Sequence, residues 1–198
     1  MTRRIDIVTD LETLGVGSDC PVFQLGAVAI NLETGEIIST FNGICDITNF
    51  NNIEGGTLKW WLKTNKDLLA QLILSPTEDE SVTVYKDEKH LSLGFLEWAE
   101  YLESCYGDLY LWGNGILFDN RIIESKCKKY GVKYPIKYYN DRDLRTIYEL
   151  AAKKLGLEDA KVLRNSVEMD NRVAHDGLND AYHEALVLHY AWKILLEE

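Results

Sequence analysis

The feature that most constrains the fold of this chain is a series of three β-rich segments near its start. Residues 5–8 form a short apolar run of β-forming residues, which predicts a buried strand. Residues 22–32 and 37–44 predict two more strands, and the four residues between them include Gly35, as expected of a hairpin turn. Three consecutive strands therefore open the fold.

The apolar spacing then changes from that of strands to that of helices. Residues 57–74 predict two short helices with a break near Asn65, and 75–80 read as an acidic turn. A strand is predicted at 109–112, followed by a helix that ends near Gly131. The other predicted helices are 91–104, 144–155 and 179–196. This order predicts a single α/β domain over residues 1–198, with a mixed central sheet and helices on both faces.

Composition limits the ways in which the chain can bind a partner. The 198 residues are 46% hydrophobic, which is enough for one sizeable core, and the formal net charge is -11. Such a charge argues against binding nucleic acid through a broad basic face, because Lys and Arg normally neutralise the phosphates. The objection weakens if acidic residues form a site for divalent cations, since bound cations reverse the local charge.

Two further features concern the environment of the protein. The four cysteines are far apart and form no C-x-x-C pair, so we expect thiols in the core rather than a zinc knuckle. The N-terminal segment reaches Asp10 and Glu12 before any long apolar run. We therefore expect neither a signal peptide nor a transmembrane span, no membrane partner and a cytoplasmic location.

Asp10 and Glu12 are the first candidate site residues. They are separated by one residue, so in an extended chain both carboxylates project to the same side. Asp10 also ends an apolar strand, where a carboxylate needs solvent or a compensating charge such as a metal ion. The alternative is an exposed acidic pair, which is common in a chain with 32 Asp and Glu residues.

Two later segments contain similar candidates. Asp119 follows a strand and two glycines, at a second strand-to-helix junction, and its alternative role is that of a helix N-cap. His175 lies in a glycine-containing segment, and Asp180 lies five residues later in the first turn of the last helix. The alternative there is a helix-capping Asp180 with an incidental His175.

Taken in order, these segments resemble the three motifs of the DEDDh exonuclease superfamily: Asp10-Leu11-Glu12-Thr13, Trp112 to Asp119, and His175 to Asp180. The resemblance implies a ribonuclease H-like fold and 3′-to-5′ cleavage of phosphodiester bonds. It also implies two Mg²⁺ or Mn²⁺ ions held by the four carboxylates, with His175 as the general base.

A closer resemblance is to the small exodeoxyribonucleases of T-even-type phages, through the Trp60-Trp61 pair, the Trp112-Gly113-x-Gly115 run and the segment around Arg142. It implies that the substrate is the 3′ end of single-stranded DNA, that nucleoside 5′-monophosphates are released, and that the location is host cytoplasm if the chain is phage-encoded. The second motif also resembles a bacterial branch reported to act on RNA, so an exoribonuclease remains the alternative. An inactive nucleic-acid-binding domain is a third alternative.

Two positions bear on which branch the chain resembles. Gly177 stands where the superfamily often has Ala, and it is expected to loosen the loop without removing its chemistry. The branch that uses a Tyr places it four residues before the final Asp, and that position here is Asp176. The branch that uses a His is therefore favoured.

The resemblance also implies residues that bind the substrate. Thr13 is expected to contact the terminal 3′-hydroxyl, and Leu14 is expected to pack under the last base. Phe118, Trp60 and Trp61 are candidates for stacking on bases, but large aromatic residues are more often part of the core.

Two arginines are candidates for phosphate contacts, because a guanidinium group matches phosphate oxygens in a bidentate way. These are Arg142 and Arg145, and their alternative role is an exposed ion pair with Asp141 or Asp143. A nearby basic group is interpreted as a solvated helix face and consists of Lys126, Lys128 and Lys129.

Overall fold

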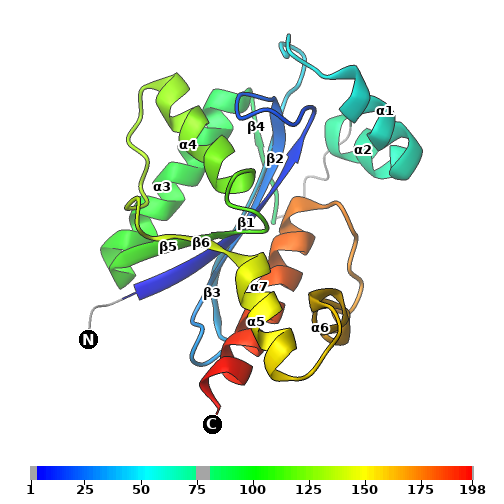
Figure 1. Cartoon of the computed structure of the whole chain (residues 1–198). Helices are drawn as coiled ribbons and strands as arrows, with labels where there is room; N and C mark the ends of the chain where they lie inside the picture. Colours follow the sequence, from blue (N-terminus) through cyan, green and yellow to red (C-terminus); the bar gives the residue numbers. More distant parts are fainter. Residues whose placement is uncertain (1–3, 75–80, 198) are drawn as a thin grey trace.

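The computed structural model describes residues 4–74 and 81–197 of the chain. They form a mixed six-stranded sheet in the order β4-β3-β2-β1-β5-β6, with helices on both faces (Figure 1). The strands are β1 (Arg4–Thr13), β2 (Val22–Ile30), β3 (Ile37–Cys45), β4 (Thr83–Tyr85), β5 (Asp108–Gly113) and β6 (Asp141–Asp143). The predicted mixed α/β architecture is confirmed.

The strand directions place the carboxyl ends of β1, β5 and β6 next to one another at the same end of the sheet. β1, β2 and β3 are successively antiparallel, and Gly35 occupies the β2–β3 turn with a φ of 78°. β5 runs parallel to β1, and β6 runs parallel to β5. Carboxyl ends of neighbouring parallel strands are where α/β domains commonly place their sites.

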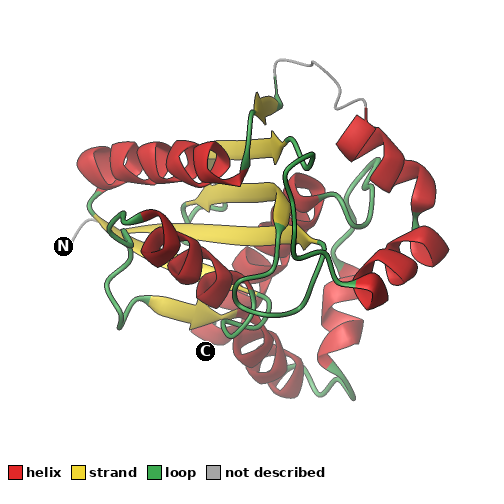
Figure 2. Cartoon of the chain, turned by 90° about the horizontal axis from the view of Figure 1, so that it is seen from above, coloured by secondary structure: helices red, strands yellow, loops and turns green. Residues whose placement is uncertain are grey.

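Seven helices occur within the described residues. They are α1 (Gly55–Thr64), α2 (Lys66–Leu74), α3 (Glu88–Tyr106), α4 (Asp119–Tyr130), α5 (Leu144–Lys154), α6 (Ala160–Ser166) and α7 (Gly177–Leu196). α3 and α4 cover one face of the sheet, α5 and α7 cover the other, and α6 packs on α5 and α7 (Figures 1 and 2). α1 and α2 pack around Leu14 and Phe23 at one end of the sheet.

Alternation along β1 decides which way its carboxylates face. Ile5, Ile7 and Leu11 belong to the core under α3 and α4, whereas Val8 belongs to the core under α7. Successive side chains of a strand point to opposite faces, so even-numbered residues of β1 face α7. Asp10 and Glu12 therefore point toward the side of the sheet on which α7 lies.

Two glycines allow α7 to approach the sheet closely. Gly26 pairs with Asp10 in the β1–β2 register, and a Cβ atom at Gly26 would lie 2.1 Å from the carbonyl carbon of Gly177. Gly177 is buried, and its backbone N–H donates to Gln24 Oε1 at 3.1 Å. The expectation that Gly177 loosens the loop is therefore wrong, because the backbone of Gly177 packs closely against β2 at the start of α7.

Most predicted elements match the structure, including the break between α1 and α2 at Asn65. The three that were not predicted are short: β4, β6 and α6. The predicted acidic turn at 75–80 lies outside the described residues. Three of the cysteines are buried as expected, whereas Cys105 is exposed. None of the described helices has the length and apolar character needed to cross a membrane.

Lys126 does not belong to a solvated helix face. It is 3% exposed, and its ammonium group lies 2.7 Å from Glu88 Oε1 and donates to the carbonyl oxygens of Asp19 and Cys20. Glu88 also accepts from Lys129 and from the hydroxyl of Tyr130. The basic group thus ties α4 to α3 and to the β1–β2 connection, apart from the exposed Lys128.

Candidate active site

The first cluster of candidate residues joins the start of the chain to its last helix. Side-chain ligand atoms of Glu12, His175 and Asp180 all lie within 4.8 Å of one another. Glu12 comes from β1, His175 from the loop before α7, and Asp180 from the first turn of α7. The alternation of β1 and the Gly26–Gly177 contact place these segments side by side.

Asp10 lies next to this cluster on the same side of β1. The pKa of its carboxyl group is raised well above the ordinary value, first by burial and then by the negative charges of Glu184, Asp180 and Asp176. The positive charge of Arg172 opposes this shift. Asp10 is therefore not one of an isolated exposed acidic pair.

Asp119 belongs to α4, on the face of the sheet opposite to α7, and lies close enough to Asp10 for the two charges to interact. It is the first residue of α4 and 4% exposed, while the N-cap of α4 is Phe118, which makes no side-chain cap bond. The helix-cap role considered for Asp119 is therefore wrong. Burial and the charge of Asp10 raise its pKa, although backbone N–H groups of Leu11 and Asn114 partly offset this.

The carboxylates of the site lie so close together that their negative charges raise one another's pKa values. Burial, followed by the charges of Asp10 and Asp180, raises the pKa of Glu12 to about 10. Buried acids of this kind must take up protons or be neutralised by a cation. An oxygen-rich set of carboxylates suits hard divalent cations such as Mg²⁺ and Mn²⁺.

His175 is held in a restricted backbone conformation. Its φ of 66° is left-handed, which is uncommon for a residue other than glycine and often marks a functional position. Its backbone N–H donates to Asp180 Oδ2 at 2.8 Å, and its ring contacts the rings of Trp60 and Trp61. These contacts fix both His175 and Asp180.

Asp180 is not the cap of α7. The cap is Asp176, whose carboxylate accepts from the backbone N–H of Asn179 at 3.0 Å. The helix-capping role considered for Asp180 is therefore wrong, and its carboxylate instead pairs with Arg172 and accepts from the backbone N–H of His175.

A cavity of about 470 Å³ opens beside Glu12 and Thr13. Trp60 and Phe118 line it, and Trp60 is 45% exposed, so the core role considered for Trp60 is wrong. Trp61 also borders the cavity, but it is 1% exposed and donates from Nε1 to the Thr13 carbonyl at 3.0 Å. Trp61 is therefore a core residue that fixes the end of β1.

Leu14 does not lie where it was expected. It is 1% exposed and packs with Phe23, Ile44 and Trp61 in the core. Val16, which is 71% exposed, lines the cavity instead.

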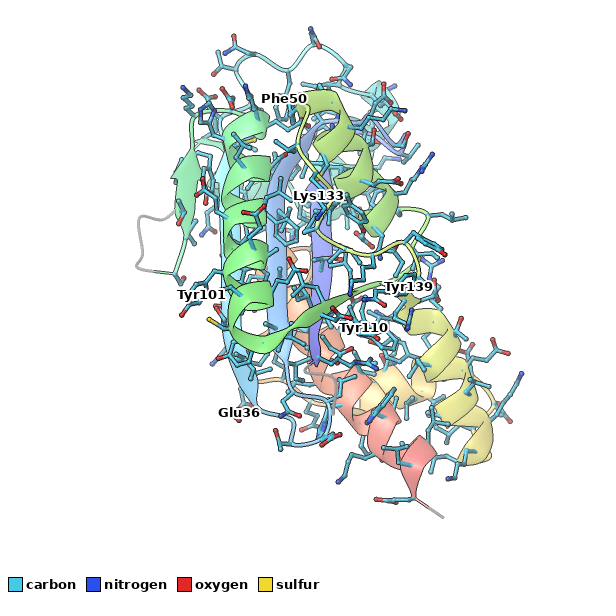
Figure 3. The ribbon with its side chains drawn as sticks, turned by 90° about the vertical axis from the view of Figure 1, so that its left-hand side faces the viewer. Glu36, Phe50, Tyr101, Tyr110, Lys133 and Tyr139 are labelled. Carbon is cyan, nitrogen blue, oxygen red and sulfur yellow. The ribbon has the colours of Figure 1, made fainter. Side chains whose placement is uncertain are left out.

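The two candidate arginines have different positions. Arg145 lies at the site, where its Nε donates to Asn114 Oδ1 at 3.1 Å. Arg142 donates to the carbonyl oxygens of Tyr139 and Asp141, and its guanidinium lies 4.8 Å from the ring centre of Tyr110. Figure 3 labels both tyrosines on the β5–β6 side of the sheet. The alternative ion pair with Asp141 or Asp143 is not formed among the described residues, and both hydrogen bonds of Arg142 come from Nη1. Its other N–H groups make no hydrogen bond to the described residues that would prevent a phosphate contact, so that contact stays a prediction.

Two charged residues at the site were not identified from the sequence. Glu184 lies one turn after Asp180, is 2% exposed and accepts from Asn114 Nδ2 at 2.6 Å. Burial and then the charge of Asp119 raise its pKa to about 8. Arg172 forms an ion pair with Asp180 at 2.6 Å. The four-residue spacing of Asp180 and Glu184 was the available signal for Glu184, since it places both on one helix face.

Comparisons with known proteins agree with this geometry. Residues 5–192 match the family model of the 3′-5′ exoribonuclease Rv2179c-like domain. The exodeoxyribonuclease of Enterobacteria phage T4 is 22% identical over 214 aligned residues, which cover 94% of this chain and 88% of the phage protein.

Solved structures show the same fold. The nuclease domain of 3′hExo, a DEDDh family member bound to rAMP, has a TM-score of 0.58 at 15% identity, over 95% of this chain and 91% of that one. E. coli exonuclease I, solved with single-stranded DNA, has a TM-score of 0.62 at 15% identity, over 93% of this chain. The match spans only 39% of exonuclease I.

The match to the family model extends over nearly the whole chain, and the fold is that of a DEDDh nuclease. The protein therefore belongs to the Rv2179c-like family and is a 3′-5′ exonuclease of the DEDDh superfamily.

Proposed function

We propose that the protein hydrolyses single-stranded DNA from its 3′ end and releases nucleoside 5′-monophosphates. The observation that carries the proposal is the convergence of five residues from three separate segments beside an open cavity. These residues, to which we assign the catalytic roles, are Asp10, Glu12, Asp119, His175 and Asp180.

The four carboxylates fit a pair of divalent cations. Their raised pKa values come from burial and mutual repulsion, which bound cations would relieve. Mg²⁺ or Mn²⁺ would be held by Asp10, Glu12, Asp119 and Asp180. When bound, such ions supply charge neutralisation at the phosphate and activation of water.

His175 is proposed to accept the proton of the attacking water. A ring nitrogen of His175 lies within 4.8 Å of a carboxylate oxygen of Glu12 and of Asp180, and the ring contacts Trp60. The backbone N–H of His175 donates to Asp180. A positioned general base contributes about 10² to 10⁴ in rate.

The cavity next to Glu12 suits the terminal nucleotide of a strand. Trp60 and Phe118 supply aromatic surface on which a base can stack without sequence preference. Thr13 lines the same cavity beside Glu12, although its hydroxyl donates to the Gly15 carbonyl at 2.7 Å. As an acceptor this hydroxyl remains able to bind the 3′-hydroxyl of the substrate. Arg145, which donates to Asn114 and is exposed, is proposed to contact a phosphate.

DNA is favoured by the similarity to the phage exodeoxyribonuclease over 94% of the chain. RNA is the second candidate, because the matching family model is described as an exoribonuclease. The hydroxyls of Thr13 and Thr57 both line the cavity, and a hydroxyl is the type of group that can recognise a ribose 2′-hydroxyl.

A degradation assay tests both parts of the proposal. Single-stranded DNA, duplex DNA and RNA of one sequence, labelled at either end, are incubated with Mg²⁺, Mn²⁺ or a chelator. The proposal requires cation-dependent shortening from the 3′ end and faster cleavage of single-stranded DNA than of RNA.

The variants His175→Ala and Asp180→Asn should each lower the rate at least about 100-fold. Arg121→Gln is a matched surface control, since Arg121 pairs only locally with Glu124 on α4. Wild-type rates for His175→Ala with saturating cation would refute the general-base role. Cleavage that persists in chelator would refute the two-cation site.

A further inference from the structure

Arg172 occupies one oxygen of the Asp180 carboxylate. Its Nε and Nη2 both donate to Asp180 Oδ1, at 3.1 and 2.6 Å. The other oxygen, Oδ2, accepts from the backbone N–H of His175 at 2.8 Å. A carboxylate oxygen has two lone pairs, so Oδ1 is fully used and Oδ2 has one lone pair left.

This ion pair lies inside the proposed cation site and not beside it. Asp180 is one of the three residues whose ligand atoms lie within 4.8 Å of one another. Only 13% of the Asp180 side chain is exposed, whereas 32% of the Arg172 side chain is exposed. Arg172 is therefore the more exposed partner of the pair, and Asp180 is the more buried one.

Arg172 also acts on a second carboxylate of the site. Its positive charge lowers the pKa of Asp10, against the combined effect of burial and three acidic neighbours. A single guanidinium group thus partly neutralises Asp10 and Asp180 together. In this position its charge does part of what a divalent cation would do.

We propose that Arg172 is an exchangeable counter-ion of Asp180, which a divalent cation displaces, and that the freed guanidinium then binds the substrate phosphate. The proposal rests on the proposed function, because it needs both the cation site and a nucleic-acid substrate. A cation and a guanidinium group repel each other at one carboxylate, so the cation gains Oδ1 only when Arg172 leaves.

The place to which Arg172 would move follows from its anchor. Residues around it remain fixed to α7, since Val173 N–H donates to Asn179 Oδ1 and His175 N–H donates to Asp180. The Arg172 side chain can therefore rotate while its backbone stays in place. It would then lie near the carboxylate cluster, which a substrate phosphate must approach. A guanidinium can bind two phosphate oxygens in a bidentate way, and the two N–H groups that Arg172 would use now both donate to one oxygen of Asp180.

The test measures cation binding without nucleic acid, by calorimetric titration of Mn²⁺ into the full chain. If Arg172 competes with the cation, Arg172→Gln should bind Mn²⁺ about three- to tenfold more tightly than the wild type. Arg172→Lys, which keeps the charge but loses the two-bond contact, should fall between them. Arg164→Gln removes another cation near the site, 3.7 Å from Glu184, and controls for general electrostatics.

The same Arg172→Gln variant should bind its substrate less well. Its KM for single-stranded DNA should rise about tenfold, and the slope of log KM against log salt concentration should decrease by about one, as for the loss of one phosphate contact. Tighter cation binding together with weaker substrate binding is not expected of a residue that only supports the fold.

The outcomes separate the two proposals. A wild-type protein that binds no Mn²⁺ and cleaves no nucleic acid would overturn the proposed function. A wild-type protein that does both, with an Arg172→Gln variant that binds Mn²⁺ equally or less tightly, would overturn the counter-ion role alone. Equal tightening in Arg164→Gln and Arg172→Gln would also overturn it.

Discussion

The rings of Trp60 and His175 are nearly perpendicular, with an interplanar angle of 85° and centroids 5.1 Å apart. Trp60 belongs to α1, and His175 belongs to the loop that precedes α7. The ring of Trp60 thus lines the cavity beside Glu12 and also supports the ring of His175, the proposed general base.

Replacing Trp60 should therefore affect catalysis more than stability. Trp60→Ala should lower kcat/KM for single-stranded DNA about 10- to 100-fold, because His175 loses a lateral contact and the cavity loses stacking surface. The melting temperature should change little, since Trp60 is 45% exposed and does not belong to the buried core. Tyr101→Ala on α3, an exposed aromatic away from the site (Figure 3), should retain the wild-type rate. Equal rates for both variants would contradict the support role.

Trp61 should show the opposite behaviour. Trp61→Phe keeps a ring in the core but removes the donor to the Thr13 carbonyl, leaving a buried acceptor without its partner. The free energy of unfolding should fall by roughly 1–3 kcal/mol, measured by urea denaturation. Trp60→Phe is the same substitution at the neighbouring exposed position and should cost much less. A similar loss in the two variants would mean that the hydrogen bond contributes nothing specific.

The stability of the cation-free protein should decrease as pH rises. The folded-state pKa values of Glu184 and Glu12 are raised, to about 8 and about 10, so the folded protein binds these protons more tightly than the unfolded chain. Their stabilising effect is complete below the unfolded pKa, near 4.5, and is lost as pH rises through the folded values. In chelator, the melting temperature should therefore fall between about pH 5 and pH 9, and Mg²⁺ should restore it most at the upper end.

Glu184→Gln should reduce that pH dependence. The amide keeps an oxygen that accepts from Asn114, and it cannot ionise. The loss of stability that Glu184 causes as pH rises to about 8 should therefore disappear. The gain at pH 9 in chelator should be on the order of a few kcal/mol. Glu149→Gln, at an exposed position on α5, should follow the wild-type curve. A Glu184→Gln curve parallel to the wild type would show that Glu184 does not titrate in this range.

Gly26 and Gly177 should differ in their tolerance of a methyl group. Alanine at Gly26 would place its Cβ 2.1 Å from the Gly177 backbone, so α7 must move away from the sheet. Gly26→Ala should cost about 3 kcal/mol or more and remove most of the activity. Gly177→Ala meets its nearest atoms at 3.2 Å and should cost about 1 kcal/mol. Thermal denaturation ranks the two variants, and the reverse order would contradict the close-contact interpretation.

Long elements with regular apolar spacing could be predicted from the sequence, and α3, α5 and α7 are examples. β6 could not, because its three residues are Asp-Arg-Asp, and they form a strand only through pairing with Leu111–Gly113. The short β4 and α6 likewise depend on their neighbours. In each case a tertiary contact decides the local structure.

The candidate site shows the same division. The order of the motifs in the sequence predicted the carboxylates and His175 as site residues. The distances between Glu12, His175 and Asp180 became known only from the structure. Arg172 carries no signal of its own, since its importance arises only from contact with a residue eight positions later. Leu14 was misplaced because its burial depends on packing against Phe23, Ile44 and Trp61, which are distant in the sequence.

The pairing of β1 with α7 has a consequence for biosynthesis. Glu12 is made early and Asp180 comes 168 positions later, so a ribosome-bound chain that still lacks α7 has only part of the carboxylate set. Because domains acquire their long-range contacts only when the distant segment is present, the nuclease site cannot assemble before α7 has left the exit tunnel. We therefore expect nascent chains of this protein to lack the proposed catalytic site until α7 has been translated.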